Sequence, residues 1–196
     1  MMSKIKPALV LAVITTLISA LLIVAHNLTY VDTSGIITEK LREKCVSLMG
    51  EGEFSIMTDE MWNEESYSYE KPEEIEKVII KDDGSVAYEI VVNGYNKDGL
   101  DLLIAMNEDG SVKGISVISI AETPGLGTKV NDEAFLGNFS GKSGAVTIVK
   151  TAPTAENEIQ GVTSATYSSE GVADAVNIAI ETFANTKGAV EGGEAE

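Results

Sequence analysis

The first hydrophobic pattern along the chain is a long uncharged stretch near its beginning. From Pro7 to Ala25 no charged residue occurs over 19 positions. As a helix this stretch is roughly 28 Å long, close to the hydrocarbon thickness of a bilayer. A cleaved secretory signal is the alternative, but its apolar part would be shorter, about 7–15 residues, and would end at a small-residue cleavage site. The pattern therefore favours a retained transmembrane helix at residues 7–26.

Charges on the two sides of this stretch predict its orientation. Lys4 and Lys6 precede it, and the first charge after it is Asp32. Because lysine and arginine are retained on the cytoplasmic side, residues 1–6 are expected in the cytoplasm. The remaining chain is then extracytoplasmic, held at the cell membrane by a single pass.

The segment that follows the apolar stretch changes to a helical and then an acidic pattern. Apolar residues recur at helical spacing between residues 33 and 49, which predicts a helix there: Ile37, Leu41, Cys45 and Leu48. Residues 51–76 carry ten acidic residues and only one basic residue, Lys71. We expect a solvated loop or short helix covering the domain, with Trp62, Tyr67 and Tyr69 as its packing anchors. Together these parts form a connecting region at residues 27–76.

From residue 77 onward, short apolar runs separated by turns predict strands. The expected strands cover residues 77–80, 86–92, 100–106, 112–120 and 145–150. Asp83-Gly84 and Asp109-Gly110 separate two pairs of these runs, and such dipeptides are strong hairpin signals. A short helix is expected at residues 131–139.

The last predicted element is a helix that begins near Ser169, capped by Ser168 or Ser169. Its buried stripe consists of Val172, Val176, Ala179, Ile180 and Phe183. The tail from Lys187 is rich in glycine and glutamate and is expected to be disordered, as residues 187–196. The pattern thus predicts an α+β fold: one transmembrane helix, then an antiparallel sheet with packed helices, whose domain covers residues 77–186.

Composition says more about the possible functions of the chain than about its fold. Thirty-one acidic and fourteen basic residues give a formal charge of −17, which argues against a nucleic-acid partner, because such a partner needs a cationic face. One cysteine, Cys45, and one histidine, His26, exclude a disulfide within the chain, a zinc finger and an iron–sulfur cluster held by this chain alone. Cys45 lies on the helical stripe and is expected to be a small buried hydrophobe. Redox chemistry would therefore depend on an organic cofactor.

Two segments rich in glycine and threonine are the candidates for such chemistry. Glu122-Thr123-Pro124-Gly125-Leu126-Gly127 follows a predicted strand, and its glycines allow close approach of a planar group. Gly161-Val162-Thr163-Ser164-Ala165-Thr166 precedes the last helix, whose first N–H groups suit a phosphate. From spacing alone, each segment is more often just a tight loop than a phosphate site.

The order of these two motifs on a single-span protein resembles the FMN-binding domain family. The similarity is to the G subunits of Rnf ion-translocating oxidoreductase complexes and to a relative, the C subunit of the sodium-translocating NADH:quinone reductase. It includes Gly94-Tyr95, the ETPGLG segment, the F-x-G-K-S stretch at residues 139–143 and the TSAT segment. Altogether it spans roughly residues 85–185.

The resemblance implies that FMN is joined covalently, as a phosphoester, to the hydroxyl of Thr166 by a flavin transferase that uses FAD as donor. The chain would then be a phosphoprotein in the chemical sense. The resemblance also implies that Glu122, Thr123 and Leu126 lie beside the flavin ring, with Gly125 and Gly127 in the same loop. Against the ribityl phosphate it implies Thr163, Ser164 and Ala165. Further implied contacts are Tyr95 and Lys150.

The motif departs from the family pattern D-x-x-(S/T)-G-A-T at two positions. Gln160 stands where aspartate is usual, so one charge is lost. Ser164 stands where glycine is usual, and it adds a Cβ that the local backbone must tolerate.

The function implied is electron transfer on the extracytoplasmic face of an Rnf-type ferredoxin:NAD⁺ oxidoreductase complex that translocates ions. Its partners would be the other membrane and peripheral subunits. The chain would contribute to a translocase without catalytic residues or metal ligands of its own, because the flavin ring is the reactive part. The alternatives are the C subunit of the quinone reductase, for which this chain is short, and an anchored acidic binding module without a cofactor.

Overall fold

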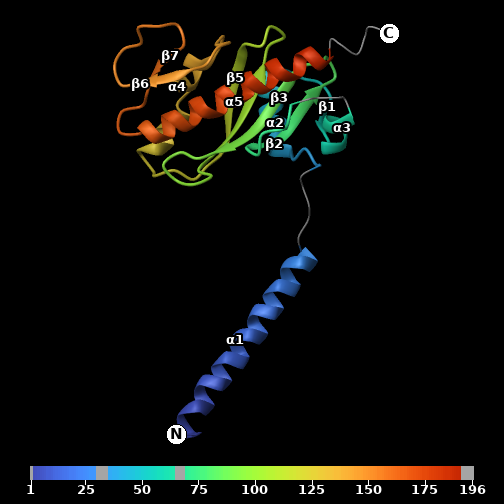
Figure 1. Cartoon of the computed structure of the whole chain (residues 1–196), viewed down its shortest axis with the longest axis vertical. Helices are drawn as coiled ribbons and strands as arrows, with labels where there is room; N and C mark the ends of the chain where they lie inside the picture. The colour runs from blue at the N-terminus through green and yellow to red at the C-terminus, as the bar shows by residue number, and fades with distance from the viewer. Residues whose placement is uncertain (1, 30–34, 65–68, 191–196) are drawn as a thin grey trace. The chain divides into compact units, whose positions relative to one another are not determined.

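The computed structural model describes residues 2–29, 35–64 and 69–190, and the chain divides into two compact units, Met1–Thr33 and Ser34–Glu196. The first unit is built on one helix, α1 (Met2–Thr29), drawn in blue in Figure 1. Its segment Leu9–His26 has a mean hydropathy of 2.5 and none of it is buried. In the described part of the chain, α1 is the one helix long and apolar enough to cross a membrane. The predicted apolar helix is confirmed and extends beyond residues 7–26 at both ends.

The second unit is built on a five-stranded antiparallel sheet in which neighbouring strands follow one another along the chain. Its strands are β1 (Phe54–Met57), β2 (Ile75–Lys81), β3 (Val86–Val92), β4 (Leu100–Met106) and β5 (Val112–Ile120). Gly84 and Gly110 sit in the predicted hairpin turns with φ of 84° and 81°, values that favour glycine. The predicted α+β fold with an antiparallel sheet is therefore confirmed, and the bounds of β3, β4 and β5 match the prediction.

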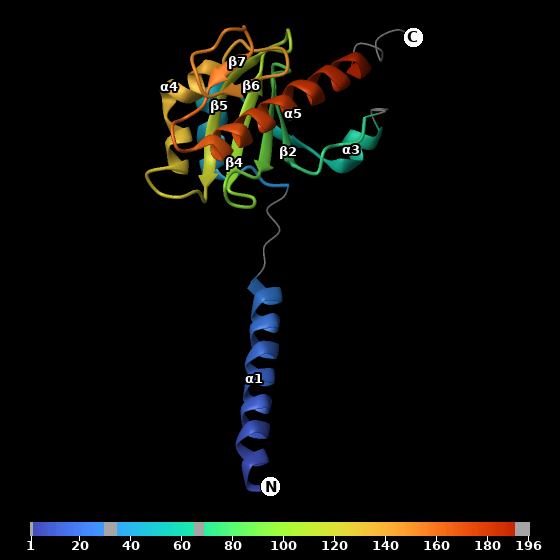
Figure 2. The same cartoon turned by 60° about the vertical axis from the view of Figure 1, so that its left-hand side comes forward.

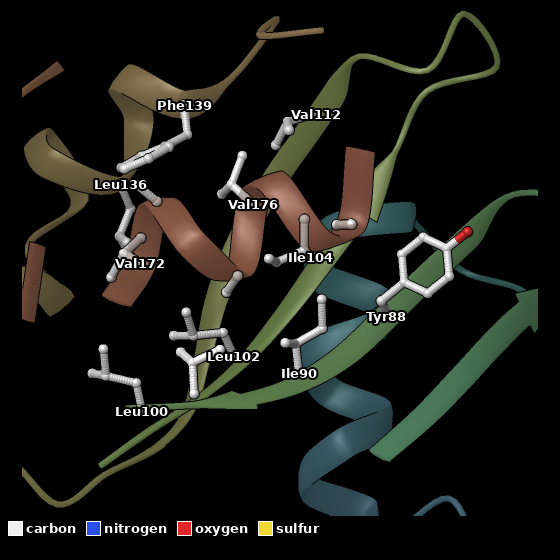
Figure 3. Packing of buried hydrophobic residues seen from close by; sticks show 14 of the residues in the cluster. Tyr88, Ile90, Leu100, Leu102, Ile104, Val112, Leu136, Phe139, Val172 and Val176 are labelled. Atoms are coloured by element: carbon white, nitrogen blue, oxygen red, sulfur yellow. The ribbon is translucent and has the colours of Figure 1, made fainter. Parts of the chain in front are cut away.

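Both faces of this sheet are covered by helices, as Figure 1 shows. α5 (Thr166–Val190) packs on one face and α2 (Glu39–Met49) on the other. Successive side chains of a strand point to opposite faces. In β4, Leu102 and Ile104 accordingly join the cluster under α5, which Figure 3 shows together with Val172 and Val176 of the helix. Leu103 and Ala105 join the cluster under α2, so the sheet is apolar on both sides.

α2 begins later than the predicted residue 33, because Thr38 caps it. The Leu41 N–H donates to Thr38 Oγ1 at 3.3 Å, and Gly50 ends the helix with φ of 83°. Cys45 is fully buried on the predicted stripe. Burial, and to a smaller extent the charge of Glu89, raises the pKa of its thiol to about 11. Cys45 is thus an inert core residue.

The acidic segment before the sheet contains an element that the prediction missed. Residues 54–57 form edge strand β1, paired with residues 78–81 of β2, instead of a solvated loop. Phe54 and Ile56 both pack against the α2 cluster, and this period-two pattern outweighs the surrounding acids. The helix that follows, α3 (Asp59–Glu64), buries Trp62 as predicted. Tyr69 is partly buried, and Tyr67 lies outside the described residues.

The predicted strand at residues 145–150 is present as a shorter strand, but it does not belong to the main sheet. β6 (Thr147–Val149) instead pairs in parallel with β7 (Glu158–Gln160) in a separate two-stranded sheet. Between β5 and β6 lie the short helices η1 (Gly127–Asn131), α4 (Glu133–Leu136) and η2 (Gly137–Phe139). Figure 2 shows α4, β6 and β7 gathered at the N-terminal end of α5.

The last helix is longer at both ends than its pattern predicted. α5 starts at Thr166 rather than near Ser169, and it continues to Val190, past the predicted start of the tail at Lys187. Residues 191–196 lie outside the described part of the chain. The early start puts Thr166 in the first helical turn.

Candidate functional site

One buried carboxyl group connects the two glycine-rich segments. Glu122 lies two residues after the end of β5, and its side chain is 5% exposed. Its Oε1 accepts a hydrogen bond from the Asn96 N–H at 3.0 Å, and its Oε2 accepts one from the Tyr95 N–H at 3.2 Å. Ser168 Oγ donates to the same Oε2 at 2.5 Å. Glu122 therefore joins three segments: the loop after β3, the loop after β5 and the first turn of α5.

The glycines around Glu122 leave room for this carboxyl group. A Cβ on Gly94 would lie 2.6 Å from Glu122 Oε1. A Cβ on Gly127 would lie 2.5 Å from Oε2 and 2.8 Å from Ser168 Oγ. Real Cβ atoms do not approach other heavy atoms so closely, because the two atoms would overlap and repel each other. The last glycine of the ETPGLG motif is thus required by Glu122 itself.

The rest of the ETPGLG loop is a tight turn that leaves one apolar side chain at the surface. Gly125 has φ of 74°, and its N–H donates to Thr128 Oγ1 at 2.9 Å. The Thr123 carbonyl accepts from the N–H groups of Leu126 at 3.1 Å and Thr128 at 3.3 Å. The Leu126 side chain remains 45% exposed.

The second loop is held against α5 by hydrogen bonds to Ser169. Ser169 Oγ accepts from the Val162 N–H and donates to the Ala165 carbonyl, both at 2.9 Å. Ser164 lies between them with φ of 65°, in the left-handed region that favours glycine. This explains why glycine is usual at its position. Ala165 is 6% exposed and belongs to the core cluster.

Thr166, the predicted attachment residue, is the first residue of α5 and is half-buried. The first intrahelical hydrogen bond of this helix is donated by the Ser169 N–H to the Ala165 carbonyl, at 2.9 Å. The N–H groups of Thr166 and its two successors therefore have no acceptor within the helix. A helix of 25 residues also presents the positive end of its dipole here, which suits an anion.

Three exposed apolar side chains lie next to the residues that Glu122 holds. Tyr95 is 69% exposed, Tyr167 is 65% exposed, and their ring centroids are 6.2 Å apart at an angle of 56°. The Tyr95 N–H donates to Glu122, Tyr167 precedes Ser168, and Leu126 precedes Gly127. In the described part of the Ser34–Glu196 unit, only two other large hydrophobic side chains are as open to solvent, Ile36 and Met61. We call Tyr95, Leu126 and Tyr167 the apolar trio.

A cleft of about 860 Å³ adjoins the second loop. Its volume lies within the range of small-molecule sites. Thr163 and Val162 line it, together with Lys129 of η1. Lys129 makes no ion pair with any other described residue, and the cleft is also lined by Lys142 and by three acidic residues, Asp132, Glu156 and Glu158. Lys150, which was predicted to contact the cofactor, does not line this cleft, and no hydrogen bond among the described residues joins it to Glu122.

The structure brings together most, but not all, of the predicted site residues. Tyr95, Glu122 and Gly127 meet directly, and Ser168 links them to the segment that ends at Thr166. The predicted contacts of these residues with a flavin stay predictions. Sequence reasoning missed the part played by Ser168, which was expected as a helix cap, and gave no role to Tyr167. A hydroxyl in a helical first turn is too common to indicate a partner 46 positions away.

The site has no donor set for a metal. Across residues 2–29, 35–64 and 69–190, no group of three or more histidine, cysteine, aspartate or glutamate side chains could hold a metal ion.

Comparisons with known proteins include one that covers both loops. Residues 94–181 match the FMN-binding domain family. The G subunit of the Na⁺-translocating ferredoxin:NAD⁺ oxidoreductase complex of Acetobacterium woodii is 36% identical over 124 residues, covering 59% of this chain and 59% of the relative. The G subunit of the proton-translocating ferredoxin:NAD⁺ oxidoreductase complex of Clostridium ljungdahlii is 36% identical over 103 residues, covering 52% and 55%. The match thus spans less than two thirds of either relative.

Two solved structures are similar to part of this chain. NqrC of Shewanella oneidensis is 22% identical with a TM-score of 0.47, covering 59% of this chain and 61% of that one. The C subunit of the Na⁺-translocating NADH-quinone reductase from Parabacteroides distasonis is 23% identical with a TM-score of 0.44, covering 56% and 61%.

Proposed function

We propose, from the match of residues 94–181 to the FMN-binding domain family, that this chain is the flavin-carrying electron-transfer subunit of an Rnf-type, ion-translocating ferredoxin:NAD⁺ oxidoreductase complex. The two curated relatives are named as the G subunits of such complexes. The observation that carries the proposal is the Glu122 network, because it joins the ETPGLG loop to the helix end that bears Thr166. FMN needs both a phosphate site and an apolar surface for its ring.

The residues around Thr166 fit FMN attached through a phosphoester. The free N–H groups at the start of α5 and its dipole favour a phosphate on the Thr166 hydroxyl. Lys129, in the cleft beside Thr163, supplies a cation without an ion pair in the described chain. Ser164 and Ala165 form the turn that leads into the helix. Covalent attachment also suits an extracytoplasmic domain, which cannot recapture a lost cofactor.

The ring of the cofactor would rest on the apolar surface beside this phosphate site. Leu126 and Tyr95 offer exposed apolar area within the network that Glu122 holds. Bound FMN supplies the electron-accepting and electron-donating chemistry. The chain's own residues bind it, orient it and cover one side of it against water.

The presence of flavin is tested on the purified full-length chain, produced in a host that also makes a flavin transferase. We expect a fluorescent band on a denaturing gel and an intact mass increased by one FMN less one water. A colourless chain of unmodified mass from such a host would contradict the proposal. It would support the cofactor-free binding module instead.

Membership of an Rnf-type complex is tested in native membranes. We expect an affinity-tagged chain to copurify with further subunits, and its flavin to be reduced when reduced ferredoxin is added. The quinone-reductase alternative predicts reduction by NADH in the presence of that complex and none by ferredoxin. Flavin that stays oxidised with either donor would contradict both versions of the electron-transfer role.

The membrane arrangement follows from α1, and we propose that the Ser34–Glu196 unit faces away from the cytoplasm. Lys113 is exposed and lies on β5, so Lys113→Cys provides a labelling site. The native Cys45 is fully buried, with a thiol pKa raised to about 11, and should not react. In intact cells, a membrane-impermeant thiol reagent should label Lys113→Cys and leave the unmodified chain unlabelled. Labelling only after the membrane is broken would show that the Ser34–Glu196 unit faces the cytoplasm, which would contradict the proposed orientation.

A further inference from the structure

We propose that Tyr167 and Tyr95 together form an aromatic wall for the flavin ring, and that Glu122 is the positioning residue that fixes this wall. The inference rests on the proposed function and deepens it, because Tyr167 has no role in the resemblance to the family. Two tyrosine rings with centroids 6.2 Å apart are both about two-thirds exposed, whereas the other described aromatic residues of this unit are buried or half-buried. Exposed aromatic surface of this kind indicates a binding partner.

The partner of the wall is identified by what lies beside it. Tyr167 directly follows Thr166, so a group attached to the Thr166 hydroxyl starts one residue from the ring. The planar isoalloxazine has the shape and polarity for offset or edge contacts with tyrosine rings. One FMN molecule attached to Thr166 would therefore place its phosphate at the N-terminal end of α5 and its ring on the aromatic wall.

Glu122 determines where both tyrosines stand. Its Oε2 accepts from the Tyr95 N–H at 3.2 Å and from Ser168 Oγ, one residue after Tyr167, at 2.5 Å. A single oxygen therefore couples the backbone beneath one ring to the helical turn beneath the other. Leu126 is coupled to the same atom through Gly127, whose Cα leaves no room for a side chain there. The wall and Leu126 are held on three segments by one carboxyl group.

This arrangement predicts how well the ring is shielded from water in variants of the full-length flavinylated chain. The measurement is quenching of flavin fluorescence by iodide, which reaches only an exposed ring. Because an aromatic contact shifts a packing equilibrium by about two- to tenfold, Tyr167→Ala should expose the ring more often by that factor. Tyr167→Phe keeps the aromatic face and should behave as the unmodified chain does. Met61→Ala on α3, which removes another exposed apolar side chain, is the control and should change nothing.

Glu122 is tested by the same readout. Glu122→Gln keeps an acceptor for part of the network and should restore most of the shielding that Glu122→Ala loses. If Glu122 only stabilised the fold, Glu122→Ala would lower the free energy of unfolding but leave iodide quenching of the flavinylated protein unchanged. That result would overturn the positioning role of Glu122.

The outcomes separate this inference from the proposed function. Flavin content is read first from gel fluorescence. A chain that carries flavin but shows equal quenching in Tyr167→Ala and the unmodified protein would overturn the wall alone. An unmodified chain without flavin would overturn both. If Tyr167→Ala loads too little flavin, Tyr95→Ala serves instead, and its quenching should rise in the same way.

Discussion

Two regions of the domain bury carboxyl groups, and they satisfy them in opposite ways. At the site, Glu122 accepts hydrogen bonds from two backbone N–H groups and one hydroxyl, and no lysine or arginine pairs with it in the described chain. Under α2, Glu89 is 7% exposed and pairs with Lys77 at 2.8 Å. Its neighbour Asp101 has a buried Oδ1 without a hydrogen-bond partner.

The difference shows what each carboxyl group contributes. Glu122 organises three backbone segments, which a charge held only by a flexible lysine could not do. Burial of the Asp101 carboxyl group, and to a smaller extent the charge of Glu89, raises the pKa of Asp101 to about 6. Lys77 and Lys40 oppose this shift without cancelling it. Glu122 therefore links segments of the fold, whereas burial of Asp101 disfavours its charged form.

The largest expected effect comes from removing the organising carboxyl group. Glu122→Ala leaves two N–H groups and a hydroxyl without their acceptor, at a cost of about 3 kcal/mol in the free energy of unfolding. Glu122→Gln should lose less, since an amide oxygen still accepts. Urea denaturation of the Ser34–Glu196 unit in the full-length protein measures both. A Glu122→Ala protein as stable as the unmodified one would show that the network is not what holds the three segments together.

The next effect tests the close packing around Glu122. Gly127→Ala forces a Cβ to within 2.5 Å of Glu122 Oε2, so something must shift, at about 1–3 kcal/mol. Gly137→Ala is the matched control, because it has open space and a helical φ of −62°. That control should be neutral or stabilising by about 0.5 kcal/mol. Thermal unfolding of the two variants should therefore differ in direction, and equal shifts would contradict the packing argument.

The pH dependence of stability distinguishes the second region. The folded pKa of Asp101 lies above its ordinary value of 3.8, so the folded state binds the proton more tightly. The stability that this proton contributes is complete below pH 3.8 and is lost as pH rises through about 6. Asp101→Asn should therefore stabilise the domain at pH 8, by about 1 kcal/mol after solvent screening, and should have little effect at pH 4. Denaturation of both proteins at pH 4 and pH 8 measures this change in the free energy of unfolding. A larger stabilisation at pH 4 than at pH 8 would contradict the raised pKa of Asp101.

The smallest effect concerns the strained residue in the second loop. Ser164 has φ of 65°, where glycine is free of the Cβ penalty. Ser164→Gly should therefore stabilise the domain by about 0.5 kcal/mol, since the relief of strain exceeds the added chain entropy of glycine. A small rise in the midpoint of thermal unfolding checks this. Destabilisation would mean that the serine side chain makes a contribution larger than its strain.

Much of the sheet could be predicted from the sequence because its signals are local. Asp83-Gly84 and Asp109-Gly110 mark turns whose glycines indeed have positive φ. The apolar runs on both sides are long enough to fix β3, β4 and β5. β1 was missed because its four residues lie among acids, and their pairing with β2 is a long-range contact. A three-residue run such as β6 carries no information on which sheet it joins.

The site was predictable in its motifs but not in its connections. Glu122 and Thr166 stand out through the segments that contain them, and the resemblance names a cofactor for both. That Glu122 turns its carboxyl group inward to Ser168 and to the backbone of Tyr95 depends on how three distant segments fold together. Glycine at position 127 is explained by this contact, which no local pattern could show.

The central claim, that the organised end of α5 carries FMN on one hydroxyl, is tested most directly by locating the flavin in the chain. Flavinylated protein is digested, and fluorescent peptides are sequenced by mass spectrometry for the unmodified chain, Thr166→Ala and the matched control Thr163→Ala. We expect one FMN on Thr166, its loss in Thr166→Ala without unfolding, and its retention in Thr163→Ala. Flavin that remains covalently bound in Thr166→Ala, or that is lost only in Thr163→Ala, would contradict the account.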